Sequence, residues 1–242
     1  MSHPPGALTG RCAVVTGASR GIGLATARAL AVAGARVVML ARTKRQLHER
    51  AAAIGADVVA IACDVTDATA VDSAAREAHV VLGGAPDILV NNAGAFVLAG
   101  IDRMETAEFE RTIAVNLIAP FHLIRTFLPG MRERGAGHIV TIGSIADRVA
   151  FPENGAYAAS KFGLRALHEV MRAELRGTGV RATLVSPGPV DTSMWDPIAP
   201  ETRAGFTPRS AMLTADAVAD AVLYVVTRPP GVNIDELRLS RS

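Results

Sequence analysis

Short runs of Val, Ile and Leu alternate along the chain with longer segments whose apolar positions recur at helical spacing. Most of the short runs are apolar at every position, which is typical of parallel strands covered by helices on both faces. Repeated alternation of strand and helix therefore predicts an α/β fold with a doubly wound, seven-stranded parallel sheet and right-handed crossovers. The predicted strands are 12–16, 36–41, 57–62, 86–91, 137–142, 180–185 and 232–239, and the predicted helices are 22–33, 43–54, 67–82, 105–118, 120–133, 155–177 and 214–227.

One long segment interrupts this alternation. Residues 187–213 show no clear periodicity and hold several prolines and the single tryptophan, Trp195. A loop of this length in a compact domain is usually functional, so the segment is predicted to be a substrate lid. We found no repeat, low-complexity tract or linker, and the chain 1–242 is predicted to be a single domain.

Charge and composition narrow the range of partners. The chain has 25 Lys and Arg against 23 Asp and Glu, a net charge of +2, which provides no general affinity for nucleic acid or a membrane surface.

The start of the chain has no pattern of a signal peptide, and the apolar runs are of strand length. Cys12 and Cys63 lie in apolar runs and are expected to pack as small hydrophobic side chains. The six histidines lack metal-ligand spacing, so no metal is expected, and a soluble, cytoplasmic protein is predicted.

A glycine-rich turn follows the first predicted strand and leads into the first helix. It comprises Gly17, Ala18, Ser19, Arg20, Gly21, Ile22 and Gly23. In a strand–turn–helix unit, such a turn leaves backbone N–H groups and the positive end of the helix facing a pyrophosphate. A glycine turn without a ligand is the alternative, but the placement directly after the first strand favours a dinucleotide site.

Further motifs follow in a fixed order. With Thr16 before it, the turn reads Thr-Gly-x3-Gly-Ile-Gly, and the chain thereby resembles the short-chain dehydrogenase/reductase family over nearly its whole length. The resemblance implies a Rossmann fold and an NADP(H)-dependent oxidoreductase that interconverts a carbonyl and an alcohol. The other matching motifs are Asp64, Asn91-Asn92-Ala93-Gly94, Asn116, Ser144, Tyr157-Ala158-Ala159-Ser160-Lys161 and Pro187-Gly188-Pro189-Val190-Asp191-Thr192.

The end of the second strand indicates which dinucleotide is bound. A site for NAD carries a carboxylate there to bond the adenosine ribose, but this chain has Ala41 followed by Arg42. Arg42 and Arg20 match positions at which NADP-preferring members of the family carry basic residues, so NADP(H) is predicted. A solvated basic helix start without any cofactor preference is the alternative reading. Lys44 lies in the same basic stretch, and whether it contacts the cofactor stays open.

The resemblance implies roles for the remaining cofactor residues. Asp64 and Val65 would hold the adenine, although Asp64 could instead cap the helix that follows. Asn91, Ala93 and Gly94 end the fourth strand, where the strand order should reverse and a ligand crevice is expected. An asparagine at this place could merely tie strands together, and in the family it does both. The last segment contributes Pro187, Gly188, Val190 and Thr192, the threonine bonding the nicotinamide carboxamide or acting as a turn cap.

Tyr157 and Lys161 are four residues apart on a predicted helix and so project from one face. By the resemblance, Tyr157 is the general acid or base, Ser144 polarises the carbonyl, Lys161 also holds the nicotinamide ribose, and Asn116 supports a proton relay. A phenol of pKa near 10 is a poor proton donor or acceptor at pH 7, and an ammonium at about 4–5 Å can lower that pKa substantially. A cation–π or packing contact on a solvated helix is the alternative for the pair.

The substrate is predicted to be neutral. Ser193, Met194, Trp195, Phe151 and Pro152 should line a mostly apolar pocket for a ketone, an aldehyde or a secondary alcohol. Arg148 and Arg203 could receive a carboxylate, although surface arginines are the commoner case. The chain ends with Val232 to Leu239 in place of the glycine-rich tail of many family members, which makes a 3-oxoacyl-carrier-protein reductase less favoured. A non-catalytic dinucleotide-binding sensor or scaffold and a sugar-nucleotide epimerase or dehydratase are further alternatives.

Two of the predicted helices are apolar around much of their circumference. Segments 120–133 and 155–177 carry Phe, Leu, Met and Val on two sides, so one side should meet the sheet and the other a second subunit. The resemblance implies a homotetramer, or a dimer, built on these helices.

Overall fold

One parallel sheet organises the fold. The computed structural model describes residues 6–242; residues 1–5, on which the signal-peptide argument rested, lie outside the described residues. The strand order is β3-β2-β1-β4-β5-β6-β7, and every neighbouring pair is parallel. The order reverses between β1 and β4, which places a ligand crevice at their carboxyl ends. The strands are β1 Cys12–Thr16, β2 Arg36–Ala41, β3 Val58–Ala62, β4 Ile88–Asn91, β5 Gly137–Ile142, β6 Val180–Pro187 and β7 Glu236–Leu239.

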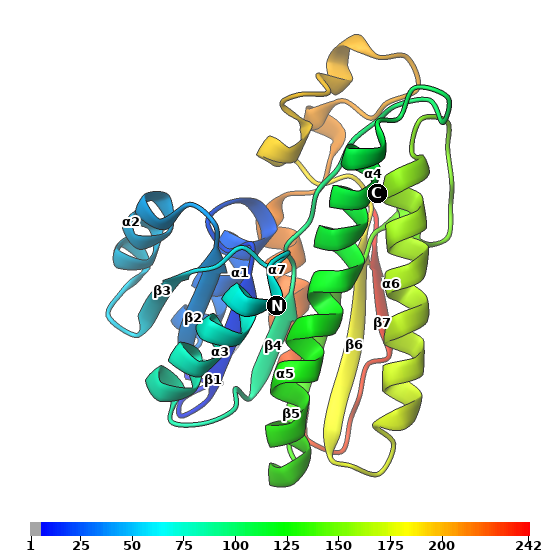
Figure 1. The fold of residues 1–242 in the computed structure, drawn as a ribbon. Helices are drawn as coiled ribbons and strands as arrows, with labels where there is room; N and C mark the ends of the chain where they lie inside the picture. The colour runs from blue at the N-terminus through cyan, green and yellow to red at the C-terminus, as the bar shows by residue number, and fades with distance from the viewer. Residues whose placement is uncertain (1–5) are drawn as a thin grey trace.

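Helices cover both faces of the sheet, as the apolar strands predict (Figure 1). The apolar sides of α1, α2 and α7 form one core cluster with the sheet, and those of α3, α5 and α6 form the other. The helices are α1 Gly21–Val32, α2 Lys44–Ile54, α3 Ala68–Leu82, α4 Thr106–Ile113, α5 Ala119–Arg134, α6 Gly155–Glu174 and α7 Ala215–Val226.

The two helices predicted at 105–118 and 120–133 are one continuous helix, so the predicted break between them is wrong. A π-helical segment, Ala114–Ile118, joins α4 to α5. Pro120 favours a helix break, but at the start of α5 its missing N–H is tolerated because the wider π turn precedes it. The predicted strand 232–239 is also too long, because pairing with β6 begins only at Glu236.

This continuous helix, 106–134, is long and apolar enough to cross a membrane by length and composition alone. Among residues 6–242 it is the one helix of that kind. The sequence analysis did not predict it, because the continuous apolar runs are only of strand length. It lies on the sheet, where Leu123, Phe127 and Met131 are buried in the core. One-third of its most apolar stretch, 33%, is buried, so much of that stretch remains uncovered in this chain.

The predicted lid is a structured segment rather than an open loop. Between β6 and α7 the chain forms three single 3₁₀ turns, Ser193–Trp195, Pro200–Thr202 and Arg209–Ala211. Arg209 connects them, because its guanidinium bonds Asp191 at 2.6 Å and Asp196 at 2.7 Å, on either side of the first turn, and its backbone N–H donates to Glu201 Oε1 of the second at 3.2 Å. The segment, yellow to orange in Figure 1, projects beyond the sheet beside the loops that follow β4 and β5.

Candidate active site

The glycine turn wraps tightly around the end of β1. Gly17 has φ +65°, and a Cβ there would lie 2.9 Å from the backbone of Ala93. A Cβ on Gly23 would lie 2.4 Å from Asn92 Nδ2 and from Gly17 O. Side chains at these two positions would therefore collide with the turn or with β4. With glycine at both positions the turn packs closely against β4. The N-terminus of α1, at Gly21, therefore lies at the point where the strand order reverses.

Two neighbouring asparagines at the end of β4 have different surroundings. Asn92 ties the strands together: its Nδ2 donates to Thr16 O at 2.8 Å, and its backbone N–H donates to Thr16 Oγ1 at 2.9 Å. Asn91 is 3% exposed, and neither polar atom of its amide has a hydrogen-bond partner among residues 6–242. The sequence analysis expected Asn91 both to bind the ligand and to tie the strands together, whereas in the structure Asn92 ties the strands. A buried unpaired amide costs about 1–3 kcal/mol, which favours a ligand contact for Asn91.

The expected ribose and adenine residues lie at neighbouring strand ends. Ala41 pairs with Ala62 in the sheet, so Arg42 and Asp64 follow strands that end side by side. Asp64 does not cap α3, because Asp67 does so by accepting from Thr69 N at 2.8 Å. Asp64 instead accepts from Thr66 N and Thr66 Oγ1, at 3.0 and 2.8 Å.

The charged forms of Asp64 and of its arginine neighbours are favoured at this end of the sheet. Burial raises the pKa of Asp64, but the two hydrogen bonds from Thr66 and the positive charge of Arg42 outweigh it, and the net pKa is lowered. Arg20 and Arg42 are exposed, and neither forms an ion pair within residues 6–242. Two unpaired guanidinium groups beside the glycine turn suit an anionic ligand such as a ribose phosphate.

The start of the lid lies against the glycine turn. A Cβ on Gly21 would lie 3.2 Å from Thr192 Cγ2, so these two residues meet although 171 positions separate them. The backbone before Thr192 is held in place, because Gly188 N donates to Leu239 O at 2.8 Å and Val190 is buried. Thr192 Oγ1 also accepts from Met194 N at 3.4 Å, so it caps the turn that follows.

Ser144, Tyr157 and Lys161 converge at one place. Ser144 begins the turn after β5, and the other two lie in the first two turns of α6. The Ser144 hydroxyl lies close enough to the Tyr157 phenol to lower its pKa. Lys161 Nζ donates to Ile142 O at 2.9 Å and lies 5.7 Å from the centroid of the Tyr157 ring. The structure thus brings the three residues together, and their roles in catalysis stay predictions.

Burial dominates the electrostatics of this group. It raises the pKa of Tyr157, which the hydrogen bond from Ser144 only partly offsets and the negative charge of Asp147 reinforces. The direction is opposite to the lowering by Lys161 that the sequence predicts. Burial also lowers the pKa of Lys161 to about 8, against a raising effect of Asp147. Lys161 directs its ammonium to Ile142 O, so desolvation of the phenolate decides the pKa of Tyr157.

Asn116 lies in the π-helical segment and is fully buried. Its Oδ1 accepts from Ala95 N at 2.7 Å, and its Nδ2 donates to Ala95 O and to Ser160 Oγ, both at 2.9 Å. The side chain therefore joins the loop after β4 to α6, next to Tyr157. A role in a proton relay stays a prediction.

An aromatic cluster surrounds Tyr157, and sequence patterns predicted only part of it. The ring of Phe96 packs edge-on against Tyr157 at 4.7 Å and against Trp195 at 5.3 Å. Phe206 extends the cluster from Trp195, at 6.3 Å, to Phe151, at 6.4 Å. Phe96 and Phe206 lie in irregular loops, where no periodicity indicates which side chains face a pocket.

Comparison with known proteins identifies the family. The family model described as short chain dehydrogenase matches residues 11–203. The chain belongs to the short-chain dehydrogenase/reductase family. An uncharacterized oxidoreductase of Staphylococcus aureus is 34% identical over 95% of this chain and 96% of its own length. Glycine betaine reductase of Emericella nidulans is 37% identical over 97% of this chain, which spans 19% of that longer protein.

A solved structure agrees with the fold and the cofactor class. A metagenomic short-chain oxidoreductase in complex with NADP superimposes with a TM-score of 0.84, at 36% identity, over 98% of this chain and 99% of that one. The predicted Rossmann-type sheet is thereby confirmed, and the protein is an oxidoreductase-family member with an NAD(P)(H) site. The residues present fit the cofactor, because the glycine cradle and the unpaired Asn91 amide meet at one crevice.

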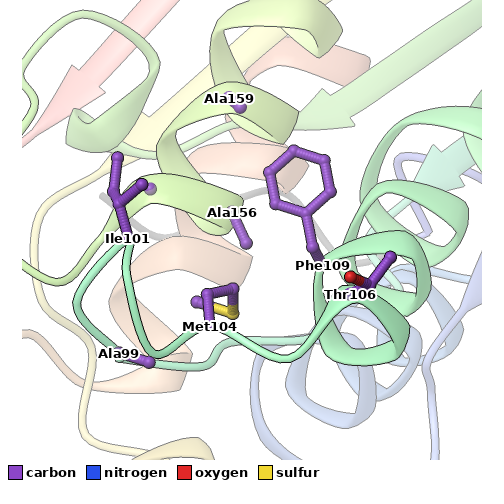
Figure 2. Close-up of a pocket in the computed structure, with 8 residues that line it drawn as sticks. Ala99, Ile101, Met104, Thr106, Phe109, Ala156 and Ala159 are labelled. Atoms are coloured by element: carbon purple, nitrogen blue, oxygen red, sulfur yellow. The ribbon is translucent and has the colours of Figure 1, made fainter.

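A cavity of about 410 Å³ lies between α4, α6 and the loop before α4 (Figure 2). Ala156 and Ala159 of α6, Thr106 and Phe109 of α4 and Ile101 of the preceding loop line it. On a helix, positions 156 and 159 point away from positions 157 and 161, so the cavity lies on the side of α6 opposite to Tyr157 and Lys161. The lining is mainly apolar, which is typical of a surface that another protein covers.

Proposed function

We propose that this short-chain dehydrogenase/reductase is an NADP(H)-dependent oxidoreductase that interconverts a neutral carbonyl compound and its alcohol, with Tyr157 as general acid and base. The observation that carries the proposal is the convergence of Ser144, Tyr157 and Lys161 beside the glycine crevice. A protein that only binds the dinucleotide has no need of a buried phenol beside a serine hydroxyl and a lysine.

The raised pKa of Tyr157 suits carbonyl reduction. The phenol stays protonated at neutral pH, so its hydroxyl can donate to the carbonyl oxygen as negative charge develops there. The Ser144 hydroxyl orients the same oxygen, and the Lys161 ammonium, 5.7 Å from the centroid of the Tyr157 ring, is a positive charge beside the phenolate that remains. When bound, the nicotinamide supplies the hydride. In the oxidation direction, Tyr157 takes the proton back from the alcohol.

The choice of NADP(H) over NAD(H) rests on charge at the end of β2. Ala41 stands where an NAD site would carry a carboxylate, and the exposed Arg42 and Arg20 are free of ion pairs within the described residues. Guanidinium groups bind phosphate through charge-assisted hydrogen bonds, which supports a site for the 2′-phosphate of NADP(H).

The aromatic cluster supports an apolar substrate that carries an aromatic ring. The chain has seven Phe, two Tyr and one Trp, and half of these ten lie in the cluster joined to Tyr157. Edge-to-face contacts with such a wall favour an aryl group next to the carbonyl. Segment 187–213, which supplies Trp195 and Phe206, is the proposed lid.

Neither arginine considered for a substrate carboxylate is free to bind one. Arg203 Nη2 lies 2.7 Å from Glu153 Oε2, and Arg148 bonds both Asp147 and Glu236. Both guanidinium groups would have to leave a protein carboxylate before they could bind a substrate carboxylate. These pairings therefore support an uncharged substrate.

A screen of NADPH oxidation tests the function and the substrate class together. An aryl alkyl ketone is expected to give a kcat/KM at least about 10-fold above that of a 2-oxo acid, because an unpaired carboxylate is costly to bury. Phe96→Ala is expected to reduce the advantage of the aryl ketone over an aliphatic ketone with the same number of carbons. Faster turnover of the 2-oxo acid, or of a 3-oxoacyl thioester, would contradict the substrate class. Cofactor binding without turnover of any carbonyl would favour the sensor or scaffold.

We also propose that the chain forms a homo-oligomer through α4, α5 and α6. Phe109, Ile118, Phe121, Phe162 and Val170 are exposed on these helices and the π-helical segment between them, and Phe109 also lines the apolar cavity of Figure 2. Exposed apolar groups at this density are typical of interfaces between subunits. The tetrameric or dimeric state and the cytoplasmic location remain predictions.

Light scattering of purified protein is expected to give a mass of two or four chains, and Phe162→Glu to lower it. Val32, on the opposite face of the sheet, is also exposed and makes Val32→Glu the matched control. A buried carboxylate without a partner is strongly unfavourable, so the first variant alone should dissociate. A monomeric wild-type chain would contradict the proposal.

A further inference from the structure

Asp147 is a fully buried carboxylate three residues after Ser144. Its Oδ2 accepts from Ser186 Oγ at 2.5 Å and from Ser144 N at 3.5 Å, while Ser144 Oγ accepts from Ala146 N. These bonds close the turn that carries Ser144 and tie it to β6. A Cβ on Gly143 would lie 2.8 Å from Asp147 Oδ2, so the carboxylate is packed directly against the backbone that enters the turn.

Arg148 extends this contact to the last strand. Its Nε donates to Asp147 Oδ1 at 2.8 Å, and its Nη2 donates to Glu236 Oε1 in β7. Glu236 pairs with Leu184 of β6 in the sheet. Ser186, Asp147, Arg148 and Glu236 therefore form a chain of bonds from β6 through the serine turn to β7.

Asp235, the residue before Glu236, contacts α6, the helix that carries Tyr157 and Lys161. Asp235 accepts from Arg172 of α6 at 2.6 Å, and its carbonyl accepts from Leu184 N at 3.1 Å. Two consecutive acidic residues thus contact, through Arg148 and Arg172, the turn with Ser144 and the helix with Tyr157 and Lys161. Asp235 directly precedes β7, and Glu236 is the first residue of that strand.

We propose that Asp147, Arg148 and Glu236 form a positioning clamp that holds Ser144 against the Tyr157 phenol, so that the C-terminal strand supports the active site. The proposal rests on the proposed function, because it assigns the clamp to the same carbonyl site. The Asp147 carboxylate is fully buried and the Arg148 side chain is 20% exposed, so their ion pair is placed to restrict the conformation of the turn. Catalysis is sensitive to such restriction, because a displacement of about 1 Å at a reacting group can cost about 10²-fold in rate.

The charge of Asp147 acts on the same residues. Burial lowers the pKa of Lys161 to about 8, and the Asp147 carboxylate opposes that lowering and thereby favours the ammonium form. A variant without this charge should lose protonated Lys161 at a lower pH. The alkaline limb of the pH–rate profile should then move to lower pH, which loss of structural support alone would not cause.

The test compares Glu236→Gln and Asp147→Asn with a matched control. Asp216→Asn removes a carboxylate that bonds Arg28 at 2.6 Å, on α7 and remote from the serine turn. We expect kcat to fall about 3- to 10-fold in Glu236→Gln and about 10- to 100-fold in Asp147→Asn, with NADPH affinity unchanged, and no change in the control. We also expect the alkaline limb to move only in Asp147→Asn.

Hydrogen exchange of the segment 143–149 provides a readout that needs no turnover. Faster exchange there in Glu236→Gln, but not in Asp216→Asn, is expected if the clamp holds the turn. Unchanged exchange together with unchanged kcat would overturn the clamp while leaving the function intact. If the wild-type protein reduced no carbonyl but Glu236→Gln still exchanged faster in segment 143–149, the proposed function would be contradicted. The clamp would then remain as an anchor of the turn. A fall in kcat accompanied by an equal loss of NADPH affinity would also overturn the positioning role.

Discussion

Tyr157→Phe is expected to lower kcat by at least about 10²-fold while leaving NADPH affinity nearly unchanged. The substitution removes the hydroxyl that exchanges a proton with the substrate oxygen and preserves the ring that packs against Phe96 at 4.7 Å. The aromatic cluster and α6 should therefore stay in place. Steady-state rates with NADPH and the best carbonyl from the screen give kcat, and fluorescence titration gives the cofactor Kd.

The chain contains its own matched control for this experiment. The second tyrosine, Tyr224, lies on α7, and its ring packs against the guanidinium of Arg228 at 4.1 Å. Tyr224→Phe removes the same atom far from Ser144 and should keep wild-type turnover. If Tyr157→Phe also turned over at the wild-type rate, the assignment of the phenol as general acid and base would be wrong.

Arg42→Asp is expected to shift the preference for NADP(H) over NAD(H) by about 10- to 150-fold, the effect of losing one charge-assisted bond to phosphate. The new carboxylate would also repel the 2′-phosphate and could accept from the ribose hydroxyls of NAD. Titration of both cofactors against the variant and the wild type measures the ratio of their Kd values.

Arg45→Asp is the matched control for charge. Arg45 is three positions further along, is exposed, and bonds Glu49 at 2.9 Å, so its guanidinium is already paired. The same charge change there should alter the ratio far less. Lys44→Asp, measured alongside, decides whether the neighbouring lysine contacts the phosphate. An unchanged ratio in Arg42→Asp would remove the basis of the NADP assignment.

Local sequence patterns predicted most of the fold. Parallel strands buried on both faces leave a continuous apolar signal, so all seven strands were found at nearly their observed positions, apart from β7. The glycine turn was also predictable, because Gly17 adopts a positive φ and Gly23 leaves no space for a Cβ, and both demands appear in the sequence as glycine. The break at Pro120 was mispredicted, because a π turn absorbs the proline and no sequence signal distinguishes this from a helix end.

The residues around Ser144, Tyr157 and Lys161 were less predictable. Phe96 and Phe206 come from loops, and Asp147 reads as an ordinary turn residue until Arg148 and Glu236 are seen beside it. The direction of the pKa of Tyr157 was mispredicted for a related reason. The spacing of Tyr157 and Lys161 shows that the two share a helix face, but not that Lys161 donates to Ile142 O or how much burial the phenol experiences.

The sequence by itself determined the doubly wound sheet, the glycine turn, the basic end of β2 and the Ser–Tyr–Lys set. Each of these depends on neighbours along the chain or on a motif of set spacing. Only the tertiary structure decided that Asn92 ties β1 to β4, that Arg148 and Arg203 are already paired, and that Glu236 of β7 contacts the serine turn through Arg148. Those contacts join residues that lie far apart in sequence or in irregular loops, and their energies depend on burial and exact distance, which exist only after the chain has folded.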